Sequence, residues 1–221
     1  MGSMRFKQLM ANGKRCYDDF GIYIKERNPS IPTKRKNYQT IPGMHGSYDF
    51  SDLYGEVIYE NRTIEYKFDI TGWDVEDLDT ERRKVMDWIV NINQTEIYDE
   101  YSPNYHWLGS YDSGSWKEDV EQGLLTVKFI VYPFAISNKK VEVNIESTSE
   151  QKELLITNNS SHRVMPIVVT DDSIQITKGE STISLSAGEW EIDGFYLDRG
   201  DNTIFVRGNA NVCIKYDEEV F

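Results

Sequence analysis

A strict alternation of apolar and polar residues marks the clearest predicted strand, at residues 63–70. Ile64, Tyr66, Phe68 and Ile70 fall on one face, and charged residues occupy the opposite face. A period of two is expected of a sheet with one buried side. The chain therefore contains at least one amphipathic sheet.

Turn-forming residues delimit further strands in the first part of the chain. Asn12 and Gly13 suit a type I′ turn, so residues 5–17 are predicted to form a β-hairpin. Residues 60–62 are a second predicted turn, just before the clearest strand. Another alternating run covers residues 124–132 and ends at Pro133. These runs predict a sheet built from local strand pairs.

One segment has helical periodicity. Asp74 is the predicted N-cap of a helix from Val75 to Val90. Its apolar stripe consists of Leu78, Val85, Met86 and Ile89. We expect this helix to cover one face of the first sheet.

A polar, proline-bearing segment precedes the clearest strand. Its prolines and alternating charges exclude a helix and a central strand. Two interpretations remain: a disordered loop, or an arm that packs on another subunit. We predict an extended arm at about residues 22–44. Its candidate inter-subunit contacts are Lys25, Arg27, Pro29, Pro32, Lys34, Arg35 and Lys36.

Three residues predict a sharp change of direction at the end of this arm. Pro42 fixes its own φ, and Gly43 and Gly46 adopt positive φ at low cost. We interpret residues 41–50 as a junction, where the arm turns back into the sheet of its own domain.

The second part of the chain shows a different pattern. From Ala135 onward short apolar runs, including one at 195–197, alternate with clusters of Asn, Asp, Gly and Ser, and no helical period occurs. This spacing predicts a β-sandwich of the jelly-roll kind. We therefore expect an N-terminal domain at 4–134 and a C-terminal domain at 135–221, preceded by an expression scar at 1–3.

Charge limits the classes of partner. With 24 basic and 37 acidic residues the formal net charge is −13, which disfavours nucleic acid and anionic membranes as partners. No apolar run is long enough to insert into a membrane. The basic residues at 34–36 are interpreted as a solvated turn. Cys16 and Cys213 are far apart, which indicates reduced thiols and synthesis in the cytosol.

No pattern of reactive residues predicts an enzyme. His45, His106 and His162 lack metal-ligand spacing, and no nucleophile elbow occurs. The acidic clusters at 171–172 and 198–202 are ordinary turn residues more often than calcium ligands. We therefore expect no catalytic residue, no metal and no cofactor.

Aromatic residues offer two hypotheses about binding. One group of aromatic residues could either pack in the core or form an interface with another chain. It consists of Tyr98, Tyr101, Tyr105, Trp107 and Trp116. In the C-terminal domain, Trp190 and Tyr196 are candidate glycan contacts.

Four motifs resemble the distal tail proteins of long-tailed bacteriophages. They are IPGMHGSYDFS at 41–51, YENRTI at 59–64, VKFIVYPF at 127–134 and GDNTI at 200–204. Together with the hairpin, the arm and the helix, the resemblance covers nearly the whole chain. It implies a mainly β fold: an N-terminal β-sandwich or split-barrel-like domain with one covering helix, then a C-terminal galectin-like sandwich.

The resemblance also implies a function. Such a protein forms a homo-hexameric ring at the tail tip of the virion, assembled in the bacterial cytoplasm, with the arm embracing the neighbouring subunit. The ring joins the tail tube to the tail-associated hub protein, and the C-terminal domains hold receptor-binding or fibre proteins. The alternative hypothesis is a carbohydrate-binding module that contacts host glycans.

Overall fold

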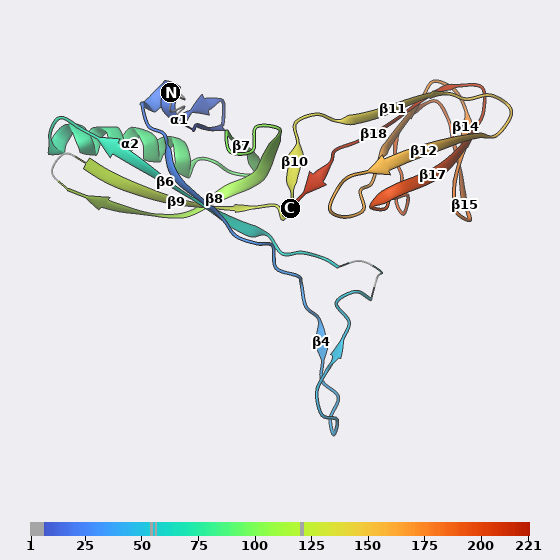
Figure 1. Cartoon of the computed structure of the whole chain (residues 1–221), viewed down its shortest axis with the longest axis horizontal. Helices are drawn as coiled ribbons and strands as arrows, with labels where there is room; N and C mark the ends of the chain where they lie inside the picture. Colours follow the sequence, from blue (N-terminus) through green and yellow to red (C-terminus); the bar gives the residue numbers. More distant parts are fainter. Residues whose placement is uncertain (1–6, 54, 56, 120–121) are drawn as a thin grey trace, which may run out of the picture. The chain divides into compact units, whose positions relative to one another are not determined.

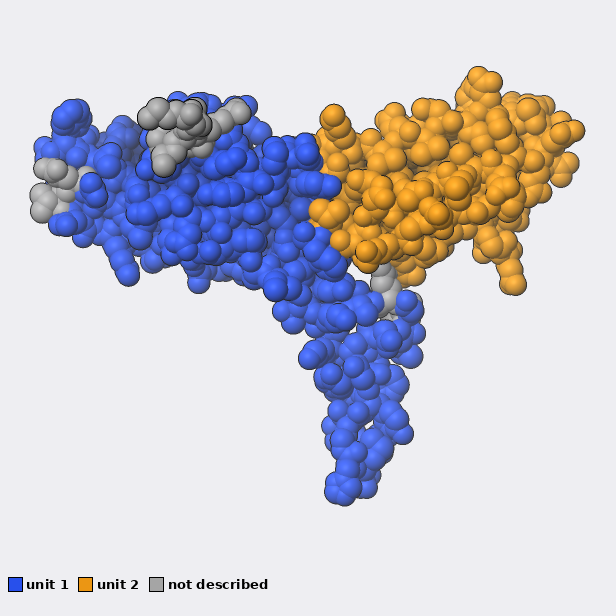
Figure 2. All heavy atoms as spheres, viewed as in Figure 1, with its two compact units in different colours: residues 1–135, 221 blue, residues 136–220 orange. Residues whose placement is uncertain are grey.

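The computed structural model describes residues 7–53, 55, 57–119 and 122–221, so the expected expression scar at 1–3 lies outside the described residues. The chain divides into two compact units. Unit 1 comprises residues 1–135 together with Phe221, and unit 2 comprises residues 136–220; Figure 2 colours them separately.

Unit 1 is built on an antiparallel sheet in the order β2-β1-β7-β8-β9-β6-β3. Its strands are β1 (Leu9–Ala11), β2 (Lys14–Arg15), β3 (Ile24–Pro29), β6 (Arg62–Thr71), β7 (Thr95–Asp99), β8 (Tyr105–Glu118) and β9 (Gln122–Val131). Two short strands, β10 (Ala135–Ser137) and β19 (Glu219–Val220), pair with each other. The mainly β fold predicted from the sequence is confirmed.

Strand β6 and helix α2 (Val75–Val90) carry the core of unit 1, as the sequence predicts. Alternate β6 side chains from Ile64 to Ile70 are buried. The Asp74 carboxylate accepts a hydrogen bond of 2.9 Å from the N–H of Asp77, which confirms the N-cap. The helix covers the sheet (Figure 1), and Trp88, which the predicted stripe omitted, donates from Nε1 to the carbonyl of Ala11 at 2.9 Å.

The first hairpin is confirmed, but it is shorter than predicted. Asn12 (φ 50°) and Gly13 (φ 71°) form the turn between β1 and β2. The chain then enters a short helix, α1 (Cys16–Phe20), which the sequence pattern did not predict. Tertiary contacts account for it, because Cys16 is buried and the ring of Phe20 stacks on Trp88 at 5.0 Å.

A long hairpin at residues 30–61, called the arm below, continues β3 and β6. The N–H of Ser30 donates to the carbonyl of Thr63, and the N–H of Glu60 donates to that of Thr33, both at 2.8 Å. Further out, β4 (Tyr38–Gln39) pairs with β5 (Tyr48–Asp49). On the returning limb the N–H of Leu53 turns back to the carbonyl of Phe50 at 3.2 Å. The arm is visible around β4 in Figure 1.

Two predictions about this region are wrong. The predicted junction is the tip of the arm, because residues 41–46 connect β4 to β5 rather than leading into the sheet. The predicted turn at 60–62 does not form, since the returning limb stays paired and runs directly into β6. Both errors arise because the sequence pattern does not show that residues 48–50 and 58–60 pair with the outgoing limb.

Three predicted arm residues, Lys25, Arg27 and Pro29, lie instead in β3, the edge strand of the sheet. Lys25 pairs with Asp69 of β6 at 2.9 Å. Pro29 is tolerated because an edge strand has no second neighbour that needs its missing N–H. The arm proper holds the remaining candidates, Pro32, Lys34, Arg35 and Lys36.

A buried carboxylate joins β3, β6 and the end of β7. The Tyr66 hydroxyl donates to Asp99 Oδ2 at 2.6 Å, and Nε of Arg27 lies 2.9 Å from the same oxygen. The N–H groups of Tyr101 and Ser102 both donate to Oδ1 at 3.0 Å. Burial and the Asp99 carboxylate raise the pKa of Tyr66, which therefore stays a neutral donor.

Unit 2 is a sandwich of two four-stranded antiparallel sheets, ordered β11-β18-β13-β16 and β12-β17-β14-β15. The first sheet consists of β11 (Val141–Glu146), β13 (Ile167–Thr170), β16 (Gly188–Glu191) and β18 (Asn211–Tyr216). The second consists of β12 (Lys152–Asn158), β14 (Ile174–Lys178), β15 (Ser181–Leu185) and β17 (Gly200–Arg207). Aliphatic side chains from both sheets form its core.

The strand predicted at 195–197 is absent from unit 2. Leu197 makes a single bridge to Val164, and the N–H of Phe195 turns back to the carbonyl of Ile192 at 3.1 Å. Gly194, at φ 80°, permits this tight turn. Phe195 and Leu197 are nevertheless buried, so the apolar run correctly marked core residues in an irregular segment.

We expect Asp99→Asn to destabilise unit 1 by about 3 kcal/mol, because the substitution leaves the Arg27 guanidinium without its buried counter-charge. Chemical denaturation followed by tryptophan fluorescence measures this change.

Asp69→Asn is the matched control, because it removes the carboxylate of a second ion pair made by β3, the one between Lys25 and Asp69. The Lys25–Asp69 pair is largely exposed, so the loss should stay below about 1 kcal/mol. Equal losses from the two variants would contradict a special role for the buried carboxylate.

Candidate assembly surfaces

The arm exposes an unusual amount of apolar surface. Ile31 is 88% exposed and Leu53 is 62% exposed. Six more large side chains on the arm are also exposed: Tyr38, Ile41, Met44, Tyr48, Phe50 and Ile58. Single exposed apolar residues are common, but a gathering of this kind on one projecting hairpin indicates a surface that a protein partner covers.

A side-chain contact joins the two limbs of the arm. Arg35 contacts both carboxylate oxygens of Glu60, at 2.7 and 3.3 Å, across its two limbs. Hydrogen bonding to Arg35 lowers the pKa of Glu60. At the tip, Gly43 (φ 85°) and Gly46 (φ 81°) have the positive φ that the sequence predicted. Arg35 is therefore engaged within its own arm.

Four aromatic rings of unit 1 pack where the arm meets the sheet. Phe134 contacts the rings of Tyr59, Phe221 and Tyr132 with centroid distances of 5.6, 5.1 and 5.7 Å. Tyr59 and Phe221 also contact each other, at 5.2 Å. The cluster anchors the returning limb of the arm.

The prediction of Trp107 as an interface residue is wrong, because its side chain is 3% exposed and belongs to the core. The guanidinium of Arg62 lies over its ring at 4.1 Å. Burial and the nearby Arg27 lower the pKa of Arg62 to about 10. The sequence could not distinguish this core tryptophan from its more exposed neighbours.

The other four predicted aromatics remain at least partly exposed. Tyr101 is the most exposed of them and follows the end of β7. Tyr98, within β7, and Tyr105, at the start of β8, are half-buried. Trp116 is also half-buried and lies against Gly123, where an added Cβ would collide with its ring. These positions stay candidates for contacts with another chain.

The sequence analysis missed Trp73, which is 93% exposed. It lies between Gly72 and the N-cap Asp74, outside every periodic run. A large aromatic between a glycine and a predicted helix N-cap, outside the predicted strand and helix, was the available signal. The exposed indole makes Trp73 a second candidate contact in unit 1.

The two predicted glycan contacts have different environments. The guanidinium of Arg163 lies 4.3 Å from the ring centroid of Tyr196 and covers one of its faces. Trp190 remains 38% exposed and lines a groove on unit 2. Only Trp190 therefore offers a surface that suits the predicted contact.

The described residues contain no cluster of His, Cys, Asp and Glu suited to a metal ion. Both cysteines are free, and burial raises the pKa of Cys16 to about 11, which keeps this thiol protonated at neutral pH. No helix in the described ranges has the length and apolar character needed to cross a membrane.

Comparison with known proteins gives a consistent result. The family model for the phage tail protein RIFT-related domain matches residues 15–131. The crystal structure of the SPP1 Dit (gp 19.1) protein, described as a paradigm of the hub adsorption apparatus in phages that infect Gram-positive bacteria, aligns with a TM-score of 0.72 at 13% identity. This alignment covers 98% of the present chain and 100% of the Dit chain.

A chain from the phage p2 baseplate in its activated conformation aligns over 96% of this chain and 98% of its own length. Its TM-score of 0.43 and identity of 7% are too low to support an argument. No curated protein matches the chain by sequence.

The family match covers more than half of the chain, and the structural alignment extends the likeness to unit 2. The protein is accordingly a structural protein of a phage tail, not an enzyme. The chain belongs to the phage tail proteins with a RIFT-related domain and has the fold of a siphophage distal tail protein, Dit.

Proposed function

We propose that this protein is a ring-forming subunit of the phage tail tip, with six copies closing into a ring that joins the tail tube to the tail-associated hub protein. The observation that carries the proposal is the arm, an ordered hairpin with exposed apolar side chains on both limbs. A projecting segment of this kind suits a head-to-tail contact, and such contacts close into rings when the rotation allows.

In this proposal the N-terminal domain at 4–134 forms the ring. The arm of one subunit lies on its neighbour, and burial of Ile31 and Leu53 there supplies about 2 kcal/mol for each side chain. Trp73 and Tyr101 are additional contact candidates in the same domain. The formal charge of −13 places like charges on adjacent copies, so apolar contacts must outweigh this repulsion.

The C-terminal domain at 135–221 faces away from the ring in this proposal and holds receptor-binding or fibre proteins. Its support is the structural likeness of the whole chain, including unit 2, to SPP1 Dit. The ring would be assembled in the bacterial cytoplasm and carried in the virion.

Native mass spectrometry and negative-stain electron microscopy test the ring directly: six-fold particles are expected, and a strict monomer at high concentration would contradict the proposal.

We expect the double substitution Ile31→Ser with Leu53→Ser to weaken self-association by at least about tenfold, because each change removes apolar area buried at the contact. Sedimentation velocity over a concentration series measures the effect.

The matched control is Leu155→Ser in unit 2, since Leu155 is also a highly exposed leucine but lies outside the arm. The control should associate like the unchanged protein. If it weakens association as much as the arm substitutions do, the arm is not the principal contact.

We expect Gly43→Val with Gly46→Val to impair association while leaving the melting of both units unchanged within about 1 kcal/mol. Both glycines have positive φ, which valine strongly disfavours, so the shape of the tip must change. No atom lies within 4 Å of a Cβ at either position, so nothing in the folded units is disturbed. Calorimetry and particle size, measured on the same samples, separate the two effects; parallel loss of both would contradict the prediction.

A further inference from the structure

Three polar side chains form a row on the outer face of one sheet in unit 2. Gln175 of β14 is in register with Ser184 of β15 on one side and with Arg207 of β17 on the other. All three are exposed, while Ile174 and Leu185, their neighbours along the strands, are buried. Paired residues of antiparallel strands share a face, so a hydroxyl, an amide and a guanidinium point outward together.

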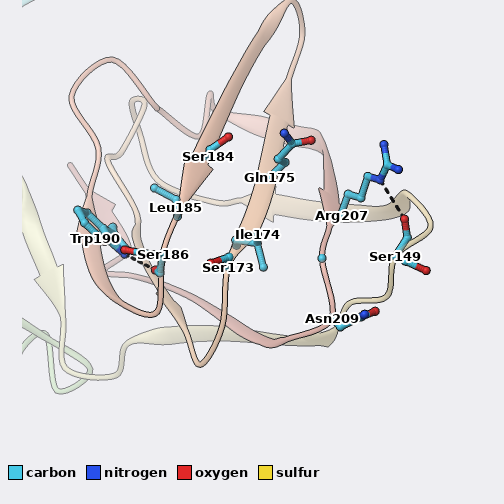
Figure 3. Close-up of a pocket in the computed structure, with 11 residues that line it drawn as sticks. Ser149, Ser173, Ile174, Gln175, Ser184, Leu185, Ser186, Trp190, Arg207 and Asn209 are labelled. Carbon is cyan, nitrogen blue, oxygen red and sulfur yellow. Dashed lines mark hydrogen bonds between the residues drawn. The ribbon is translucent and has the colours of Figure 1, made fainter.

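This row spans three adjacent strands, a distance of about 10 Å. It borders a groove of about 690 Å³. Figure 3 shows Trp190 and Ser186 on one side of the groove, Arg207, Ser149 and Asn209 on the other, and β14 between them. The size suits two linked sugar rings better than a single small ion.

The tryptophan of this groove has a fixed orientation. Its indole Nε1 donates to the carbonyl of Ser186 at 2.8 Å. Gly188 lies beside the ring, because a Cβ at that position would come within 3.4 Å of Nε1. The hydrogen bond holds the indole in place while part of the ring stays exposed to the groove.

Arg207 has hydrogen-bonding capacity left over. Its Nε donates to the carbonyl of Ser149 at 2.9 Å, which positions the guanidinium. The described structure shows no ion pair for its two terminal nitrogens. Arg207 is also the only charged residue among the described residues that line the groove, and no acidic side chain does so, although the whole chain is strongly acidic.

We propose that this groove binds a saccharide. A sugar ring has an apolar C–H face, which packs against the Trp190 indole, and hydroxyl groups around its edge, which bond to Ser184, Gln175 and Arg207. Nucleic acid is disfavoured because the groove offers a single cation, and a purely apolar ligand is disfavoured because seven of the eleven lining residues have polar side chains. The lack of acidic side chains also admits sugars that carry a carboxylate.

The inference rests on unit 2 alone and does not depend on ring formation. The test uses the full chain labelled with ¹⁵N at tryptophan, with the Trp190 indole signal assigned by Trp190→Phe. The protein is titrated with glucose, galactose, N-acetylglucosamine and glucuronate. We expect at least one sugar to shift the Trp190 signal in a saturable manner, with a dissociation constant on the order of 1 mM, while the other indole signals stay in place.

Two variants show whether the row takes part. Gln175→Ala and Arg207→Ala should each weaken binding at least about fivefold, since each removes hydrogen bonds to the sugar. Gln151→Ala is the matched control and should bind like the unchanged protein, because Gln151 is also an exposed glutamine of unit 2 but lies outside the groove.

Three results would overturn the proposal. The first is that none of the four sugars shifts the Trp190 signal at about 50 mM, well above a millimolar dissociation constant. The second is that the Gln175→Ala and Arg207→Ala variants bind sugar as tightly as the unchanged protein. The third is that a copurified tail protein, and not a sugar, occupies the groove. Particle size, measured on the same samples, reports ring formation separately.

Discussion

The buried carboxylate of Asp99 is the constraint on which the geometry of unit 1 depends. It contacts Arg27 on the edge strand β3, Tyr66 on β6 and two backbone N–H groups of the loop that follows β7. A buried charge is tolerable only when several partners compensate it, so these segments must keep their places together. Both limbs of the arm leave from β3 and β6, and their direction is thereby set within the core.

The parts of the fold that could be predicted from the sequence are those in which one side of an element is buried. Alternation identified β6 and β9, and an N-cap followed by an apolar stripe located α2 correctly. Helix α1 could not be predicted in this way, because five residues are too few to show a period and packing against Trp88 stabilises them. For Phe195 the sequence predicted an element that does not form: the residue is buried, as its apolar character suggests, but it lies in an irregular segment and not in a strand.

The candidate site was harder to predict for a related reason. Eight large apolar side chains of the arm are exposed, so its sequence shows no alternation that would mark a buried face, and its second limb could not be recognised. The tip glycines could be predicted because glycine is favoured where φ is positive. The sequence does not indicate that these glycines lie at the tip of a hairpin. The structure was also needed to separate buried from exposed tryptophans. Trp107 belongs to the core and Trp73 lies on the surface, although both have polar neighbours in the sequence.

The pairing of β6 has a mechanical consequence. This strand pairs along its length with β9 and from Ile64 to Phe68 with β3, and the returning limb of the arm runs directly into it. A pull on the arm along the strand axis would load these hydrogen bonds in parallel, as in shear, instead of opening them one at a time. The arm can therefore transmit force into the sheet without unravelling.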